Sequence, residues 1–162
     1  MRANFGCGTD YRKDWVNIDY DKTLKADKYA DLNKIPFPFK NASFSEIYCE
    51  NFIEHLKITV PEFLLECRRV LKREGKVVLV FPNAWWWRCR LSFLLGSFLW
   101  KSHYSPYHFN QLVKPSWIKV IAKSIGFEII EGEKCGGLSG FLFKNNMDLR
   151  EATASLTLRK RG

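Results

Sequence analysis

The sequence predicts an α/β fold built on a mostly parallel β-sheet. Short apolar segments of strand length alternate along the chain with segments of helical periodicity, and this alternation is typical of parallel sheets. A continuous apolar run at residues 76–81 has the composition of a buried parallel strand. Glycines at positions 6 and 8 bracket a tight turn directly after the first apolar segment. These three observations favour an open sheet whose loops meet at one edge.

The first half of the chain supplies most of the expected elements. We expect strands at residues 2–7, 16–20, 27–31 and 45–50, followed by a helix at 61–72. Apolar residues recur at helical spacing in that last segment, Pro61 suits its first turn, and Gly75 suits its end. The prolines within residues 36–39 exclude a helix interior there, because each removes a backbone donor. Residues 9–15 are too polar and too short for a full phosphate-binding helix.

The second half continues the pattern with one exception. The strand at residues 76–81 is followed, after a long intervening segment, by a helix that begins at Pro115 or Ser116, runs to about residue 124 and is closed by Gly126. Strands are expected at 127–131 and 154–161. Because no clear helix separates these two, they are expected to pair antiparallel at the edge of the sheet.

Composition narrows the class of protein. At 162 residues the chain is expected to form one domain, residues 1–162, with room for a real core. No run of about 18 uncharged apolar residues is present, so a membrane-spanning helix is not expected. A strand expected almost at the N-terminus leaves no room for a signal peptide. The five cysteines form no C-x-x-C pair and fit reduced cytosolic thiols, and no metal site is expected.

The net charge of +9 invites a nucleic-acid interpretation. The basic residues are nevertheless dispersed, and the cluster Arg68, Arg69, Lys72 and Arg73 falls at the end of the expected helix, where cations complement the helix dipole. A solvated helix end accounts for most of this charge, and an anionic substrate or membrane surface is the alternative. Nucleic acid is not an expected partner.

A nucleoside ligand is indicated at the carboxyl ends of the first two strands. The turn at Gly6 and Gly8 lets backbone lie close to a ligand. Asp19 ends the next strand, where a carboxylate can accept both hydroxyl protons of a ribose. Ligands of open α/β sheets bind beyond the carboxyl ends of the strands.

An ordered set of short motifs carries a resemblance to a known family. The set is Asn4-Phe5-Gly6-Cys7-Gly8, Val16-Asn17-Ile18-Asp19, Ala30-Asp31-Leu32, Ile35-Pro36-Phe37-Pro38-Phe39, Glu54-His55-Leu56, Arg69-Val70-Leu71-Lys72 and Gly75-Lys76-Val77-Val78-Leu79. The chain resembles class I S-adenosylmethionine-dependent methyltransferases, in the small group related to ubiquinone and menaquinone methyltransferases. The match is close over residues 3–83 and looser over 107–127.

The resemblance implies a Rossmann-like sheet of seven strands in the order 3-2-1-4-5-7-6, with only the seventh strand antiparallel. Family members usually carry a helix before the first strand, and the sequence lacks it here, so we expect a more open cofactor pocket on that side. The implied activity is methyl transfer from S-adenosylmethionine (EC 2.1.1.-).

The implied cofactor-binding residues are Asn4, Phe5, Gly6, Cys7, Gly8, Asp19, Tyr20, Asp31, Leu32, Glu50 and Asn51. By resemblance the glycine turn faces the methionine portion, Asp19 accepts the ribose hydroxyls, and Asp31 with Leu32 contacts the adenine. Glu50 and Asn51 end the fourth strand near the sulfonium, where Glu50 is either a pocket carboxylate or a structural ion-pair partner.

His55 is the best acid–base candidate, because imidazole titrates near neutral pH. A structural or substrate-positioning role is the alternative. No dedicated base is required if the enzyme only aligns an acceptor with the activated methyl group. Tyr104, Tyr107 and His108 are weaker candidates for the acceptor pocket.

An apolar segment follows the fifth strand at residues 84–108. Residues 84–100 hold four of the six tryptophans, among them Trp85 and Trp86, with arginines near the start and Lys101 at the end. We expect this segment to be largely helical. It is either ordinary core packing, a substrate lid with Trp85 and Trp86 against the acceptor, or an interfacial helix on a membrane or a second copy.

Two functions follow from these expectations. The leading one is methyl transfer to a small apolar or amphiphilic acceptor, such as a quinone or lipid-like molecule. The protein is then expected to be cytoplasmic and either to contact a membrane surface or to form a homodimer. The alternative is a non-catalytic methyltransferase-like binding module or partner subunit.

Overall fold

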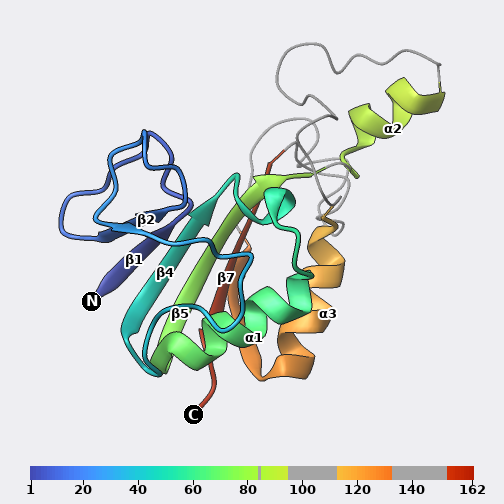
Figure 1. Cartoon of the computed structure of the whole chain (residues 1–162). Helices are drawn as coiled ribbons and strands as arrows, with labels where there is room; N and C mark the ends of the chain where they lie inside the picture. Colours follow the sequence, from blue (N-terminus) through green and yellow to red (C-terminus); the bar gives the residue numbers. More distant parts are fainter. Residues whose placement is uncertain (84, 95–112, 133–152) are drawn as a thin grey trace.

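The computed structural model describes residues 1–83, 85–94, 113–132 and 153–162, which contain seven strands and four helical segments (Figure 1). The strands are β1 (Arg2–Phe5), β2 (Val16–Asp19), β3 (Lys28–Tyr29), β4 (Phe44–Glu50), β5 (Leu71–Pro82), β6 (Phe127–Gly132) and β7 (Thr153–Lys160). The helices are the 3-10 turn η1 (Ile53–His55) and the α-helices α1 (Val60–Val70), α2 (Trp87–Leu94) and α3 (Pro115–Ile125).

All seven strands join one sheet in the order β3-β2-β1-β4-β5-β7-β6. The pairs among β1 to β5 are parallel, whereas β7 runs antiparallel to both β5 and β6. The expected order, the single antiparallel strand and the insertion of β7 between β5 and β6 are therefore confirmed. Because β1, β2 and β4 are parallel, the loops after them meet at one edge of the sheet.

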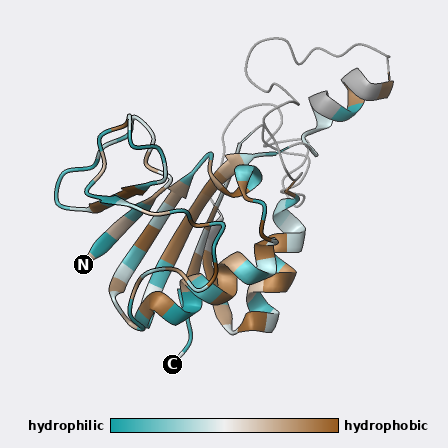
Figure 2. Cartoon of the chain, viewed as in Figure 1, coloured by the Kyte–Doolittle hydropathy of each residue, from teal (hydrophilic) through white to brown (hydrophobic). Residues whose placement is uncertain are grey.

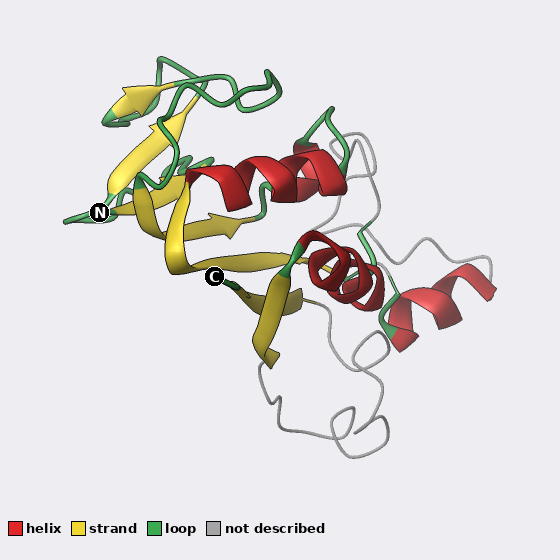
Figure 3. Ribbon diagram, turned by 90° about the horizontal axis from the view of Figure 1, so that it is seen from below, coloured by secondary structure: helices red, strands yellow, loops and turns green. Residues whose placement is uncertain are grey.

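One face of the sheet is covered and holds the core. Helices α1 and α3 lie side by side over this face (Figure 3). Alternate residues of β4, β5 and β7 point into it, and Ile47, Leu79 and Leu156 are fully buried. Hydrophobic residues follow these strands and the adjoining helix surfaces (Figure 2). Strict alternation along the strands is the pattern of a sheet with one buried face.

The opposite face carries no helix among the described residues. Its side chains are polar and aromatic and shield one another: the Arg12 guanidinium lies 3.5 Å from the centre of the Tyr48 ring, and that of Arg2 lies 4.6 Å from the Trp15 ring. Residues 9–15 form turns, as expected, in place of a helix. Cation–π contacts thus take over part of the covering that a helix gives in fully layered α/β folds.

Helix α1 starts where the sequence predicts and ends earlier. Thr59 and Glu62 form a reciprocal capping box, in which the backbone N–H of Thr59 donates to Glu62 Oε2 over 2.8 Å. The helix ends at Val70, and Leu71 is extended and already pairs with Phe44 of β4. The expectation of a helix as far as residue 72 was therefore wrong, because the strand pairing begins four residues before Gly75.

A buried ion pair ties the loop before β4 to α1. The carboxylate of Glu66 accepts from the backbone N–H of Phe37 over 2.7 Å and from the Arg69 guanidinium over 2.6 Å. Arg69 also donates to the carbonyl oxygens of Phe37 and Phe39. The rings of Phe37, Phe39 and Phe44 pack around Phe5 of β1. The contacts of Glu66 and Arg69 with Phe37 and Phe39, here called the clamp, fix the chain that runs from Asp31 to β4.

Candidate cofactor site

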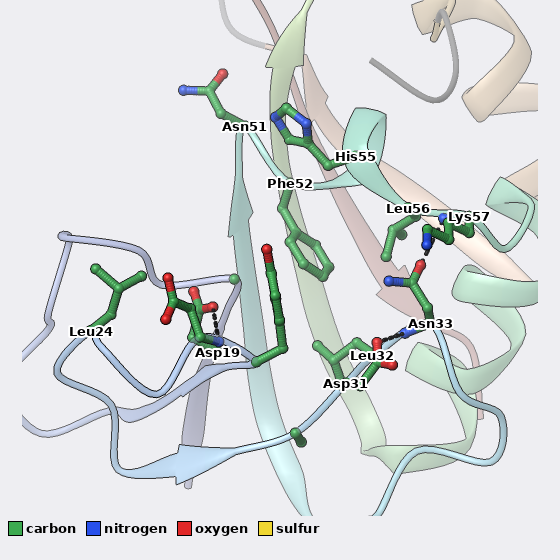
Figure 4. A pocket seen from close by; sticks show the side chains of 14 residues that line it. Asp19, Leu24, Asp31, Leu32, Asn33, Asn51, Phe52, His55, Leu56 and Lys57 are labelled. Atoms are coloured by element: carbon green, nitrogen blue, oxygen red, sulfur yellow. Dashed lines mark hydrogen bonds between the residues drawn. The ribbon is translucent and has the colours of Figure 1, made fainter. Parts of the chain in front are cut away.

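A cavity of about 580 Å³ lies beyond the carboxyl ends of β1, β2 and β4 (Figure 4). Its lining comes from four loops that follow β1 to β4. The lining residues are Gly6, Asp19, Tyr20, Asp21, Leu24, Ala30, Asp31, Leu32, Asn33, Asn51, Phe52, His55, Leu56 and Lys57. This is the place where open α/β sheets bind their ligands.

Gly6 brings backbone against the cavity for two physical reasons. Its φ is +65°, a left-handed conformation that a side chain disfavours. A Cβ built on Gly6 would also collide with the ring of Phe52. Gly8 has a φ of +51° and directs its N–H to Asp19 Oδ2 over 2.9 Å. The two glycines therefore shape the turn together, although only Gly6 lines the cavity.

Asp19 is held rigidly at the end of β2. One carboxylate oxygen accepts from the Gly8 N–H and the other from the Asp21 N–H, over 2.9 and 3.0 Å. The side chain still borders the cavity although the residue is only 7% exposed. A carboxylate oxygen can accept more than one hydrogen bond, so Asp19 keeps acceptor capacity for a ligand hydroxyl pair.

The wall opposite Asp19 combines an acidic residue with apolar side chains. Asp31 Oδ1 accepts from the Asn33 N–H over 3.0 Å, and Asn33 Oδ1 accepts from the Lys57 N–H over 2.7 Å, which links the loops after β3 and η1. Leu32 is buried and forms part of the cavity surface with Leu56. The arrangement offers an apolar slot with a carboxylate at its rim, as a purine base would require.

The loop after β4 completes the cavity. Asn51 has a φ of +46°, and its N–H donates to the Val80 carbonyl over 2.9 Å. Phe52 follows it and lies between the glycine turn and α1, where its ring contacts Phe63. His55 borders the cavity with its side chain 43% exposed. Figure 4 shows Asn51 and His55 on the same side of the cavity, above Phe52.

The structure brings together most of the expected cofactor residues. Six of them line the cavity: Gly6, Asp19, Tyr20, Asp31, Leu32 and Asn51. His55, the acid–base candidate, lines it as well.

Five expected cofactor residues lie outside the cavity lining. Asn4 is buried and donates to the Asp10 carbonyl, and Phe5 lies in the core. Cys7 is buried too, its thiol faces the Lys25 carbonyl, and burial raises its pKa to about 11. Gly8 acts through Asp19. Glu50 accepts from the Tyr48 hydroxyl over 2.7 Å and lies 3.7 Å from Arg12, so it is a structural partner on the helix-free face of the sheet.

The expected acceptor residues fall in or next to the segment after β5. The ring of Trp85 lies 5.9 Å from that of Trp117 of α3, tilted by 50°, and the backbone N–H of Trp85 donates to the side-chain oxygen of the buried Asn83. Neither Trp85 nor Trp86 lines the cavity. Tyr104, Tyr107 and His108 lie outside the described residues. Of the expected segment 84–108, residues 87–94 are helical, as α2.

Several cavity residues escaped the sequence analysis. Asn33 and Lys57 flank motifs that were recognised, and Leu56 lies within one. The hydrogen bond between Asn33 and Lys57 joins two loops and needs the folded chain. Phe52 follows Asn51 directly, and its role in excluding a Cβ at Gly6 has no local signal.

A buried acid lies directly behind the cavity. Glu54 is 3% exposed, and burial raises its pKa to about 7. Among the described residues no group of histidine, cysteine and acidic side chains could hold a metal ion.

Comparisons with known proteins concern the sequence and the fold of the chain. The family described as "Methyltransferase domain" matches residues 4–79. An uncharacterized protein of Methanocaldococcus jannaschii is 32% identical over 88 residues, which are 50% of this chain and 38% of that protein. The chain thus spans well under half the length of this curated relative.

Solved structures share the fold. A SAM-dependent methyltransferase from Archaeoglobus fulgidus superposes with a TM-score of 0.70 at 17% identity, over 98% of this chain and 85% of that one. A putative methyltransferase of Haloferax volcanii, solved in complex with the Trm112 methyltransferase activator, gives a TM-score of 0.62 at 12% identity, over 99% and 82%. Residues 4–79 thus match the methyltransferase domain family, and the sheet has the strand order expected of class I S-adenosylmethionine-dependent methyltransferases.

Proposed function

We propose that this chain is a methyltransferase that binds S-adenosylmethionine in the cavity at the carboxyl ends of β1, β2 and β4. The observation that carries the proposal is the convergence of Gly6, Asp19, Asp31 and Asn51, from four separate loops, on one cavity of about 580 Å³. A ligand with a ribose, a purine base and a charged amino-acid tail matches this combination of fixed carboxylates, apolar slot and close backbone.

Each part of the cofactor has a partner in this cavity. Asp19 would hold the ribose hydroxyls, and Asp31 with Leu32 would hold the adenine. The backbone at Gly6 and the Asn51 side chain would face the methionine portion. When bound, the cofactor supplies a methyl group on a positively charged sulfur, and the protein's part is to orient an acceptor against it and exclude water.

The acceptor is proposed to be small and apolar or amphiphilic. Support comes from α2, which projects away from the sheet (Figures 1 and 3) and exposes 44% of Leu91 and 81% of Leu94. Trp117 and Val120 of α3 are exposed as well, at 57% and 68%. Apolar surface of this kind is typical of a site for an amphiphilic molecule, a membrane surface or a second subunit. No helix of the described residues is long and apolar enough to cross a bilayer.

Isothermal calorimetry with S-adenosylhomocysteine tests the cofactor assignment. We expect micromolar binding, roughly −8 kcal/mol. Asp19→Ala should weaken it by about 1–3 kcal/mol, because charge-assisted hydrogen bonds to the ribose are lost. Asp10→Ala is the matched control, since that carboxylate is exposed, pairs with Arg12 and lies outside the cavity. Equal affinities of Asp19→Ala and wild type would refute the ribose assignment, and no binding by wild type would favour a non-catalytic module.

A further inference from the structure

Glu54 is a buried carboxyl group with no evident structural role. It is 3% exposed, and neither carboxylate oxygen has a hydrogen-bond partner among the residues that the structure describes. Leaving a buried polar group without partners costs folding free energy, so such a group calls for an explanation outside stability. Replacing it by an apolar residue would relieve that cost at once.

Two polar groups lie close to the Glu54 carboxyl group: its own backbone N–H and the imidazole of His55. Glu54 Oε1 lies 3.9 Å from Nε2 of His55, the next residue in η1. From β4 it faces the buried thiol of Cys49, whose pKa is raised by burial first and by the charge of Glu54 second. The buried face of β5, which packs against η1, offers Leu79 and Phe81. The titratable neighbours among the described residues are thus Cys49 and His55.

His55 connects this buried acid to the cavity. Its imidazole borders the cavity on the side where Asn51 also lies (Figure 4). The buried Glu54 carboxylate lies 3.9 Å from Nε2 of the same ring. An imidazole between a cavity and a carboxylate is an arrangement that can accept a proton from a bound molecule and stabilise the resulting positive charge.

We propose that Glu54 is a positioning residue that works through His55, and that the two side chains together take up the proton which a methyl acceptor gives up. The proposal rests on the proposed function and narrows its substrate class. The acceptor would carry a neutral hydroxyl or amine, whose nucleophilic atom still holds a hydrogen when it binds.

The proton balance is simple. As the acceptor atom bonds to the methyl carbon, its proton moves to the imidazole of His55. The imidazole becomes an imidazolium, and the neighbouring Glu54 carboxylate balances the new charge at short range in an apolar environment. The imidazolium then returns the proton to water through its exposed edge. An acceptor without a removable hydrogen would gain nothing from this pair.

Coupled titration is the readout that separates this role from a purely structural one. The full chain is labelled with ¹³C at histidine Cε1, and the His55 signal is assigned by its loss in His55→Asn. In wild type, the ¹³C chemical shift of His55, followed from pH 5 to 9, should show a second inflection at the pH where Glu54 ionises. In Glu54→Gln this inflection should vanish. In Glu46→Gln, the matched control, it should persist, because Glu46 pairs with Lys76 elsewhere on the sheet.

A reciprocal measurement covers the case in which Glu54→Gln does not fold. With ¹³C at glutamate Cδ, the Glu54 carboxyl inflection should move by roughly half a pH unit or more in His55→Asn relative to wild type. A single His55 inflection that is the same in wild type and Glu54→Gln would overturn the proposal. The proposal would also be overturned if the Glu54 inflection lay at the same pH in His55→Asn and wild type.

Calorimetry distinguishes this failure from failure of the proposed function. If wild type and Glu54→Gln both bind S-adenosylhomocysteine with equal affinity while His55 titrates alone, only the acid–imidazole pair is refuted. If wild type does not bind S-adenosylhomocysteine, the proposed function is refuted, and so is the acceptor assignment that depends on it.

Discussion

Two regions of this sheet are stabilised in different ways. Residues 1–57, here called the polar half, contain short strands and long loops held by side-chain-to-backbone hydrogen bonds from Asn17, Asp19 and Asp27. The described residues from 71 onward, the apolar half, contain the long strands β5 and β7 and two helices with exposed apolar side chains. The match to the methyltransferase domain family covers residues 4–79, and so includes the polar half from residue 4 onward.

The difference separates two tasks in one fold. A cofactor of fixed chemistry is recognised best by polar atoms whose positions are preset, and buried carboxylates bonded to backbone N–H groups meet that need. An amphiphilic acceptor requires apolar area instead, which the exposed residues of α2 and α3 supply. The cofactor assignment can therefore rest on individual hydrogen bonds, whereas the acceptor assignment rests on surface character.

The largest expected effect lies in the clamp that orders the polar half. Arg69→Ala should lower the free energy of unfolding by about 3–4 kcal/mol, because it leaves the buried Glu66 carboxylate without its positively charged partner. Urea denaturation followed by circular dichroism measures this change. Lys34→Ala is the control: Lys34 is 83% exposed and 3.9 Å from Asp31, so its loss should change stability by less than about 0.5 kcal/mol. Equal effects in both variants would mean that the clamp does not hold the loop.

A pH-dependent effect should appear where the two halves meet. Burial raises the pKa of Glu54 to about 7 from 4.5, so the native state binds more protons than the unfolded state between these values. Stability contributed by the protonated acid is present below pH 4.5 and is lost as the pH rises through 7. At pH 9 the loss should reach about 3 kcal/mol.

Glu54→Gln removes this titration. The free energy of unfolding of Glu54→Gln relative to wild type should therefore rise between pH 4.5 and 7 and stay constant above pH 7. The amide itself adds only a difference that does not depend on pH. Urea denaturation at pH 5, 7 and 9 measures the slope. A difference that does not change with pH would show that Glu54 ionises as an exposed glutamate does.

Much of the fold was predictable because local sequence patterns determine many of its elements. The run at residues 76–81, the glycine turn and Pro61 at the start of α1 are each recognisable from local sequence, and the family's strand order then arranges the elements. The end of α1 was not predictable in this way. Leu71 continues the helical pattern, but its pairing with Phe44 of β4, a long-range contact, decides its conformation.

The candidate site divides along the same line. Asp19 was found because the end of its strand can be located from the sequence, and Asp31 was found through the family resemblance. Glu50 occupies an equally suggestive position, yet alternation along β4 points it to the helix-free face, where Tyr48 and Arg12 engage it. Glu54 stood inside a recognised motif, but its burial without partners depends on η1 packing against β5 and has no sequence signal.

The smallest effect on stability is expected in the apolar half, where function is expected to suffer. Leu91→Ser combined with Leu94→Ser removes exposed apolar area from α2 and should change the free energy of unfolding by less than about 1 kcal/mol, because surface substitutions cost little. The affinity for S-adenosylhomocysteine should stay the same, since neither residue lines the cofactor cavity.

The binding behaviour of this double variant should change. Its binding to anionic liposomes, measured by co-sedimentation, or its self-association, measured by analytical ultracentrifugation, should fall. Serine substitutions at Lys13 and Lys22, on the loops of the polar half, are the matched control and should leave self-association unchanged. If the leucine double variant binds liposomes and self-associates like wild type, the exposed leucines of α2 have no part in binding, and the assignment of an amphiphilic acceptor loses its main support.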